Sequence, residues 1–116
     1  MEKQNIKVSH DKEEDIISLF REGSRVKFSF DLALPKGDIV LDYDFNGYIV
    51  GLEFFNASSY FPFLKKSLNT SNLKAKMSIQ YGSNWAQISY ELSLPNMKPV
   101  SNLINAPYNK KLILEH

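Results

Sequence analysis

Apolar side chains recur at every second position in several separate stretches of this chain. In residues 25–35, apolar residues such as Val26 and Phe28 alternate with charged and polar ones. A period of two places one face of a β-strand against a core and the other face in solvent. The same alternation returns in residues 74–81 and 85–94. The pattern therefore predicts a mainly β protein built from antiparallel hairpins.

Turn signals divide the chain into these hairpins. Asn46-Gly47 tolerates the positive φ angles of a tight turn and lies between two apolar runs, which predicts a hairpin over residues 39–55. The apolar runs 6–8 and 16–20 flank an acidic segment and predict an N-terminal hairpin. The turn at 82–84 predicts a third hairpin from the strands on either side of it.

One short helix is expected near residues 58–68, which makes the fold class α+β with a dominant sheet. Ser58 or Ser59 could accept hydrogen bonds from the first-turn N–H groups. Pro62 would be tolerated only within that first turn.

Proline-rich sequence follows residue 94 and predicts an irregular tail. Lys111–Leu114 predicts a final edge strand. The last three residues, 114–116, resemble the start of a purification tag, so His116 is excluded from site reasoning.

Length and composition limit the classes of function. The 116 residues fit a single domain, with a hairpin unit at 6–58 and a second strand unit at 73–115. The sequence has no Cys, which excludes disulfides, thiolate metal sites and a cysteine nucleophile. A net charge of +1 gives no general attraction to nucleic acid. No apolar run approaches the roughly 20 residues of a membrane helix, and no signal-peptide core is seen, so a cytoplasmic protein without membrane contact is expected.

Residues 42–53 match the oxygen-ligand spacing of a calcium-binding loop. The ligands would be Asp42, Asp44, Asn46, the Tyr48 carbonyl and Glu53. The preceding Pro35 and Gly37 make a poor helix, whereas a calcium loop of this type needs a helix on each side. In an extended return strand, Glu53 would lie about 20 Å from the turn. The hairpin interpretation is therefore favoured, and calcium is kept as the alternative cofactor.

Five aromatic residues crowd together after this hairpin: Phe54, Phe55, Tyr60, Phe61 and Phe63. They could fill the core between sheet and helix. Alternatively, they could form an exposed surface for a second copy of the chain or a small protein partner, because aromatic residues are enriched in interface cores.

Catalytic patterns are missing from the sequence. There is no Gly-x-Ser-x-Gly elbow, phosphate loop or dinucleotide fingerprint. His10 lies beside the acidic residues 13–15, which favours a solvated turn over a catalytic or metal site. Lysines at 65–66, 74 and 76 could line a basic edge, but lysine on edge strands more often prevents aggregation, so nucleic acid is an unlikely partner. We expect no enzyme activity.

Two segments resemble a small prokaryotic family catalogued as domain of unknown function 2283. Residues 10–19, HDKEEDIISL, are similar to its opening Y-D-x-E-x-D-x-L-Y-I. Residues 39–58, IVLDYDFNGYIVGLEFFNAS, are similar to its second signature, I-V-D-Y-D-x-x-G-x-I-V-G-I-E-I-L-x-A-S. The resemblance covers about residues 6–58. It implies a small antiparallel sheet, no established activity and, because similar proteins are sometimes encoded beside small toxin-like proteins, a partner-binding role.

The sequence thus favours a non-enzymatic protein-interaction module. A calcium-binding domain that uses Asp42, Asp44, Asn46 and Glu53 is the second hypothesis. A small-molecule enzyme is the third, and it would require a pocket around His10 and the neighbouring acidic residues.

Overall fold

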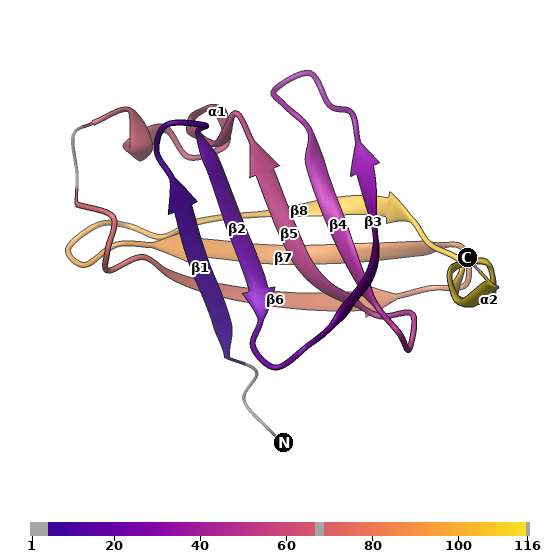
Figure 1. Cartoon of the computed structure of the whole chain (residues 1–116). Helices are drawn as coiled ribbons and strands as arrows, with labels where there is room; N and C mark the ends of the chain where they lie inside the picture. Colours follow the sequence, from indigo (N-terminus) through magenta and orange to yellow (C-terminus); the bar gives the residue numbers. More distant parts are fainter. Residues whose placement is uncertain (1–4, 67–68, 116) are drawn as a thin grey trace.

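Two antiparallel sheets pack face to face in the computed structural model, which describes residues 5–66 and 69–115. The first sheet has the order β1-β2-β5-β4-β3 and the second β6-β7-β8. Figure 1 shows the strands of the second sheet running across those of the first. The strands are β1 (Ile6–Asp11), β2 (Ile16–Arg21), β3 (Val26–Leu32), β4 (Ile39–Asp44), β5 (Ile49–Phe55), β6 (Lys74–Tyr81), β7 (Trp85–Ser93) and β8 (Val100–Pro107).

The apolar side chains that occupy every second position of the strands form the core. Leu52 on β5 pairs with Leu19 on β2 and Leu41 on β4, and these three side chains are almost fully buried. On the second sheet, Ile88 and Leu92 of β7 face them. Burial of a large apolar side chain contributes roughly 1.5–3 kcal/mol, so each of these residues stabilises the contact between the two sheets.

Three short helical segments cover the ends of the two sheets: α1 (Ala57–Tyr60), the 3₁₀ segment η1 (Pro62–Lys65) and α2 (Lys110–Glu115). Figure 1 places α1 beside the turn between β1 and β2, and α2 at the opposite end of the molecule. The helices therefore fill two separate places where one sheet extends past the other.

The mainly β prediction with three hairpins is confirmed. The helix expected near 58–68 is split, because α1 ends at Tyr60 and Pro62 begins η1; residues 67 and 68 lie outside the described residues. Ser58 and Ser59 do not cap α1, because its N-cap is Asn56.

Two predictions for the C-terminal region are wrong. The expected irregular tail contains β8, because its prolines lie just before the strand and at its last residue, where a missing N–H costs little. The expected strand 111–114 is α2, which buries Ile113 and begins after Asn109, whose Oδ1 accepts the Leu112 N–H at 3.2 Å. Of the tag-like residues, 114 and 115 belong to α2, and His116 lies outside the described residues.

None of the helices in the described part of the chain is long and apolar enough to cross a membrane.

Candidate functional site

An apolar groove of about 390 Å³ opens between β3 and the C-terminal end of β8, beside α2. We call it the α2 groove. Clefts of this size, lined mainly by aromatic and aliphatic side chains, are typical binding sites. The groove is lined by Phe28, Ser29, Phe30, Tyr43, Asn84, Pro107, Tyr108, Asn109, Leu112 and Ile113.

Stacked rings form the wall of the α2 groove. The Phe28 and Tyr43 rings lie 4.9 Å apart at 15°, and the Tyr43 and Tyr108 rings lie 6.4 Å apart at 20°. The Tyr108 hydroxyl donates to the Gly47 carbonyl at 2.7 Å. Burial raises the pKa of both tyrosines to about 12, so both rings are neutral. The wall is therefore rigid and uncharged.

The rim of the α2 groove remains open to solvent. Phe30 is 44% exposed and Leu112 is 63% exposed. Among the strands that the structure describes, β3 pairs with β4 alone and ends the first sheet. Unpaired edge N–H and C=O groups beside exposed apolar side chains are the features with which a sheet accepts another strand.

The aromatic cluster predicted as an interaction surface lies mostly in the core. Phe54 and Phe61 have no exposed surface, and their rings pack at 5.1 Å. Tyr60 and Phe63 are half-buried against the same core. Only Phe55 is exposed, at 38%, because successive strand residues point to opposite faces. Of the two alternatives, these residues therefore mainly fill the core between sheet and helix, and they do not form one continuous exposed surface.

The predicted calcium ligands are divided between two places. Residues 39–44 and 49–55 are strands, so the helix–loop–helix frame is not formed. Asp44 Oδ1 instead accepts the backbone N–H groups of Asn46 and Tyr48, both at 2.9 Å, which stabilises the hairpin turn. Within residues 5–66 and 69–115, no group of three or more His, Asp or Glu side chains could hold a metal ion.

Asp42 and Glu53 form a carboxyl pair on the outer face of the first sheet. Asp42 is buried, and its Oδ1 accepts the Ser29 hydroxyl at 2.6 Å. Its other oxygen lies 2.8 Å from where a Cβ on Gly51 would stand, so glycine makes room for it. Desolvation, and then the charge and hydrogen bond of Asp42, raise the pKa of Glu53. Glu53 therefore keeps its proton to a higher pH than a separate carboxyl group would.

A second cavity, of about 460 Å³, lies between the β1–β2 turn and residues 66, 69 and 70, which follow η1. We call it the His10 pocket. His10 Nδ1 and Thr70 Oγ1 lie 3.0 Å apart in it. The predicted acidic surroundings of His10 are present only in part, because Asp15 lines the cavity together with two lysines. The lining residues are His10, Lys12, Asp15, Leu64, Lys66, Asn69 and Thr70.

Asp15 joins the two segments that carry the family resemblance. Its carboxylate accepts the Ser58 N–H at 3.1 and 3.2 Å and the Ser58 hydroxyl at 2.7 Å. Its carbonyl accepts the Ala57 N–H at 2.8 Å. Asp15 therefore satisfies the first turn of α1 from another part of the chain, which is a structural role.

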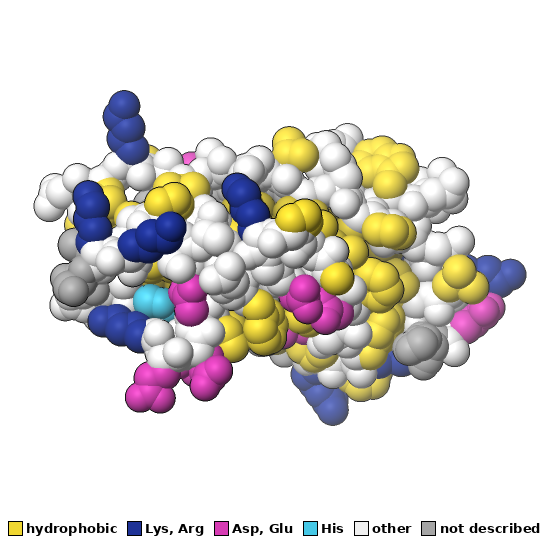
Figure 2. All heavy atoms as spheres, turned by 90° about the horizontal axis from the view of Figure 1, so that it is seen from above, with side chains coloured by type: hydrophobic (Ala, Val, Ile, Leu, Met, Phe, Trp, Pro, Cys, Tyr) yellow, Lys and Arg dark blue, Asp and Glu magenta, His cyan; other side chains and the backbone are white. Residues whose placement is uncertain are grey.

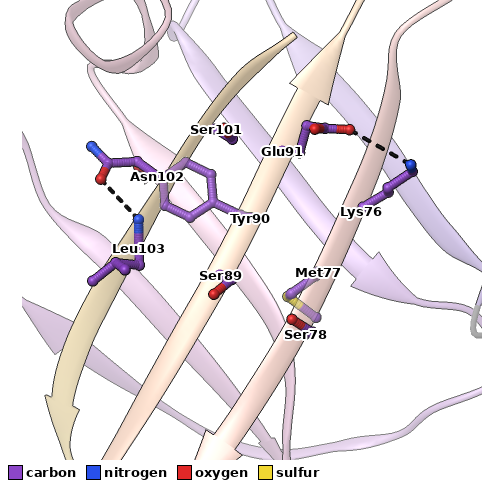
Figure 3. A pocket seen from close by; sticks show the side chains of 9 residues that line it. All are labelled: Lys76, Met77, Ser78, Ser89, Tyr90, Glu91, Ser101, Asn102 and Leu103. Atoms are coloured by element: carbon purple, nitrogen blue, oxygen red, sulfur yellow. Dashed lines mark hydrogen bonds and ion pairs between the residues drawn. The ribbon is translucent and has the colours of Figure 1, made fainter.

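A shallow depression marks the outer face of the second sheet (Figure 3). Ser78 and Ser89 leave it open because their side chains are small, and the Lys76–Glu91 ion pair at 3.9 Å borders it. Its volume is about 520 Å³, but it is a broad, open surface, and none of its described lining residues is a buried polar side chain that points into it.

Comparison with known proteins supports the resemblance for the N-terminal half of the chain. A protein of Methanocaldococcus jannaschii, itself described as uncharacterized, is 39% identical over 56 residues, which are 48% of this chain and 45% of that protein. The match thus spans less than half the length of this relative. No solved structure matches the chain. Residues 7–58, which contain β1 to β5 and the start of α1, match the family described as "Protein of unknown function (DUF2283)", as the two sequence motifs predicted.

Proposed function

We propose that this protein is a non-enzymatic protein-interaction module whose partner docks at the α2 groove. The observation that carries the proposal is the exposed, apolar rim of this groove beside β3, the outermost of the described strands of the first sheet. Exposed apolar surface rimmed by polar residues marks interaction sites in soluble proteins. The proposed setting is the cytoplasm, with which a sequence free of cysteine is compatible.

The proposed partner contributes an extended segment. A strand that adds to β3 would gain main-chain hydrogen bonds, and its alternate side chains would reach the groove beside Phe30. Asn84 and Asn109 lie at the groove margin and supply the polar groups that fix orientation. Neither role needs a catalytic group or a cofactor.

The test uses two matched substitutions, Phe30→Ser and Phe55→Ser. Both rings are partly exposed, at 44% and 38%, but only Phe30 lines the groove. Immobilised wild-type protein and both variants are offered a lysate of the native host, and captured proteins are purified and titrated by calorimetry. We expect a partner that binds the wild type and Phe55→Ser and loses at least about tenfold in affinity for Phe30→Ser, since central aromatic residues dominate interfaces.

Three outcomes contradict the proposal. The first is the absence of any protein whose binding depends on Phe30. The second is a partner lost equally from Phe55→Ser, which would point to the opposite face of the sheet. The third is a concentration-dependent dimer that Phe30→Ser dissociates, which would make a second copy the occupant. Hydrogen exchange of the β3 amides in the complex adds an independent measurement, because strand addition should slow their exchange.

A further inference from the structure

The His10 pocket has a different chemistry from the α2 groove and lies at the other end of the molecule. Figure 2 looks down on the molecule from above and shows a histidine (cyan) at the left, with both Lys or Arg (dark blue) and Asp or Glu (magenta) side chains beside it. The cavity is mostly polar, and the only aliphatic residue among its described lining is Leu64. Its volume of about 460 Å³ falls in the range that holds small organic molecules.

Hydrogen-bond donors dominate the described lining of the His10 pocket. Lys12 and Lys66 carry ammonium groups with three donors each, and Asn69 carries an amide. The bond of His10 to Thr70 uses Nδ1 and leaves Nε2 for a further partner. Donors from the β1–β2 region, from Lys66 and from residues 69 and 70 therefore meet at one cavity.

One carboxylate lies among the described lining residues. Asp15 directs its oxygens to the backbone N–H and the hydroxyl of Ser58. The described lining thus carries two ammonium groups and one carboxylate, and the negative charges of Asp15 and Asp11 both act on His10.

We propose that the His10 pocket binds the phosphate group of a small phosphate monoester. Phosphate offers several acceptor oxygens and a double charge, which suits two ammonium groups with neutral donors beside them. The cavity exceeds the needs of a bare ion, and Leu64 provides an apolar contact for the organic part of the ester. This proposal is independent of the proposed protein partner, because the two sites share no residue.

His10 provides the spectroscopic probe for this binding. Its partial burial lowers the pKa of the imidazole, and the nearby charge of Lys12 lowers it further. A phosphate dianion in the pocket would favour the imidazolium and raise that pKa. Asp15 and Asp11 also act on His10 and raise its pKa, so the comparison is made within one protein, with and without the anion.

The experiment is an NMR titration of the imidazole signals of His10 and the amide of Thr70 at constant ionic strength. Inorganic phosphate and glycerol phosphate are the two probes, and sodium chloride is the reference. We expect saturable shifts with both probes, tighter binding of the ester, and a rise in the pKa of His10. Lys66→Gln should weaken binding about fivefold to tenfold, the effect of losing one charge-assisted hydrogen bond. Lys111→Gln, an exposed lysine on α2 at the far end, should leave binding unchanged.

Each remaining outcome overturns the proposal. Shifts that never saturate, or that Lys111→Gln reduces as much as Lys66→Gln, mean general charge screening. Binding of free phosphate without the ester contradicts the monoester. If a single-stranded oligonucleotide binds saturably and neither phosphate probe does, the two lysines of the pocket bind nucleic acid instead. None of these results alters the response of the α2 groove to Phe30→Ser.

Discussion

The two ends of the molecule are closed by short helices in opposite ways. At the first end, α1 and η1 bury Ala57 and Phe61 completely, and the Phe61 ring packs on Phe54 and Tyr90. At the second end, α2 buries Ile113 but leaves Leu112 63% exposed. The first end is therefore part of the core and has the polar His10 pocket at its margin. At the second end, α2 packs beside the stacked aromatic rings and the apolar α2 groove stays open.

The difference follows from what anchors each helix. Asp15 holds α1 from the β1–β2 turn through both its carboxylate and its carbonyl. α2 is held by the Asn109 cap, by the bond of Tyr108 to Gly47 at its approach, and by the lysine hydrogen bonds from Lys110 to Tyr48 and from Lys27 to Leu114. The anchor of α1 is a part-buried contact with one carboxylate, whereas α2 is held at its edges and keeps an exposed apolar surface between them.

The largest expected effect is the difference in unfolding free energy between removing a buried ring of the core and removing an exposed ring at the rim of the α2 groove. Phe54→Ala removes a fully buried ring and should lower the free energy of unfolding by about 3–5 kcal/mol. Phe30→Ala removes a ring that is 44% exposed and should cost about 1 kcal/mol or less. Urea denaturation of both variants measures the contrast. Equal losses would mean that the rim of the α2 groove is part of the core, and the comparison of the two ends would fail.

Most of the sheet could be predicted from the sequence because its signals are local. The alternation of apolar and polar residues predicted the strands. Asn46-Gly47 predicted the central hairpin, which is formed by β4 and β5. α2 was missed because six residues carry too little periodicity to distinguish a helix from a strand. Asn109, a good N-cap residue, was the signal that could have found it. β8 was missed because its prolines were interpreted without regard to their positions at its ends.

The candidate sites could not be predicted because they depend on long-range packing. Phe54 and Phe55 are adjacent in sequence, and only the assembled sheet shows that one is buried and the other exposed. The contact of Asp15 with Ser58 joins residues 43 positions apart. The pairing of Asp42 with Glu53 depends on the register between β4 and β5, in which Asp42 lies opposite Gly51. His10 was noticed as part of an acidic turn, but its cavity is completed by Lys66 and Thr70, which local sequence could not bring to it.

The second prediction tests the anchor of α1. Asp15→Ala removes the carboxylate that accepts three hydrogen bonds from Ser58 and places alanine at a φ of 55°. The loss should be about 2 kcal/mol in the free energy of unfolding, combining a lost helix cap with backbone strain. Asp15→Asn keeps an acceptor and tolerates the left-handed conformation, so it should cost less than half as much. If both substitutions cost the same, the charge rather than the hydrogen-bond geometry anchors α1.

The third prediction concerns the carboxyl pair, which lies on the central strands between the two ends. Because the pKa of Glu53 is raised in the folded protein, its favourable contribution is complete below about pH 4.5 and is lost as the pH rises through the raised pKa. Glu53→Gln keeps a donor for Asp42 without the second charge and should stabilise the protein at pH 8 by about 0.5–1 kcal/mol, because the site is partly exposed. Thermal melts from pH 4 to 8 measure it, with Glu91→Gln as the control. A gain that is constant with pH would contradict the raised pKa of Glu53.

The smallest expected effect is on the pH dependence of the unfolding free energy, which should differ between the two ends. His10 has a lowered pKa in the folded protein, so the unfolded chain takes up a proton first as the pH falls below about 6.5, and stability decreases over that range. The decrease should be only a few tenths of a kcal/mol, because the side chain is partly exposed. The α2 groove has no carboxylate, histidine or lysine in its described lining. The wild type should lose unfolding free energy between pH 7.5 and pH 5.5. His10→Gln should lose less over this range, and Phe30→Ala should lose the same amount as the wild type. A profile altered by Phe30→Ala, or unaltered by His10→Gln, would place the pH response elsewhere than at the α1 end.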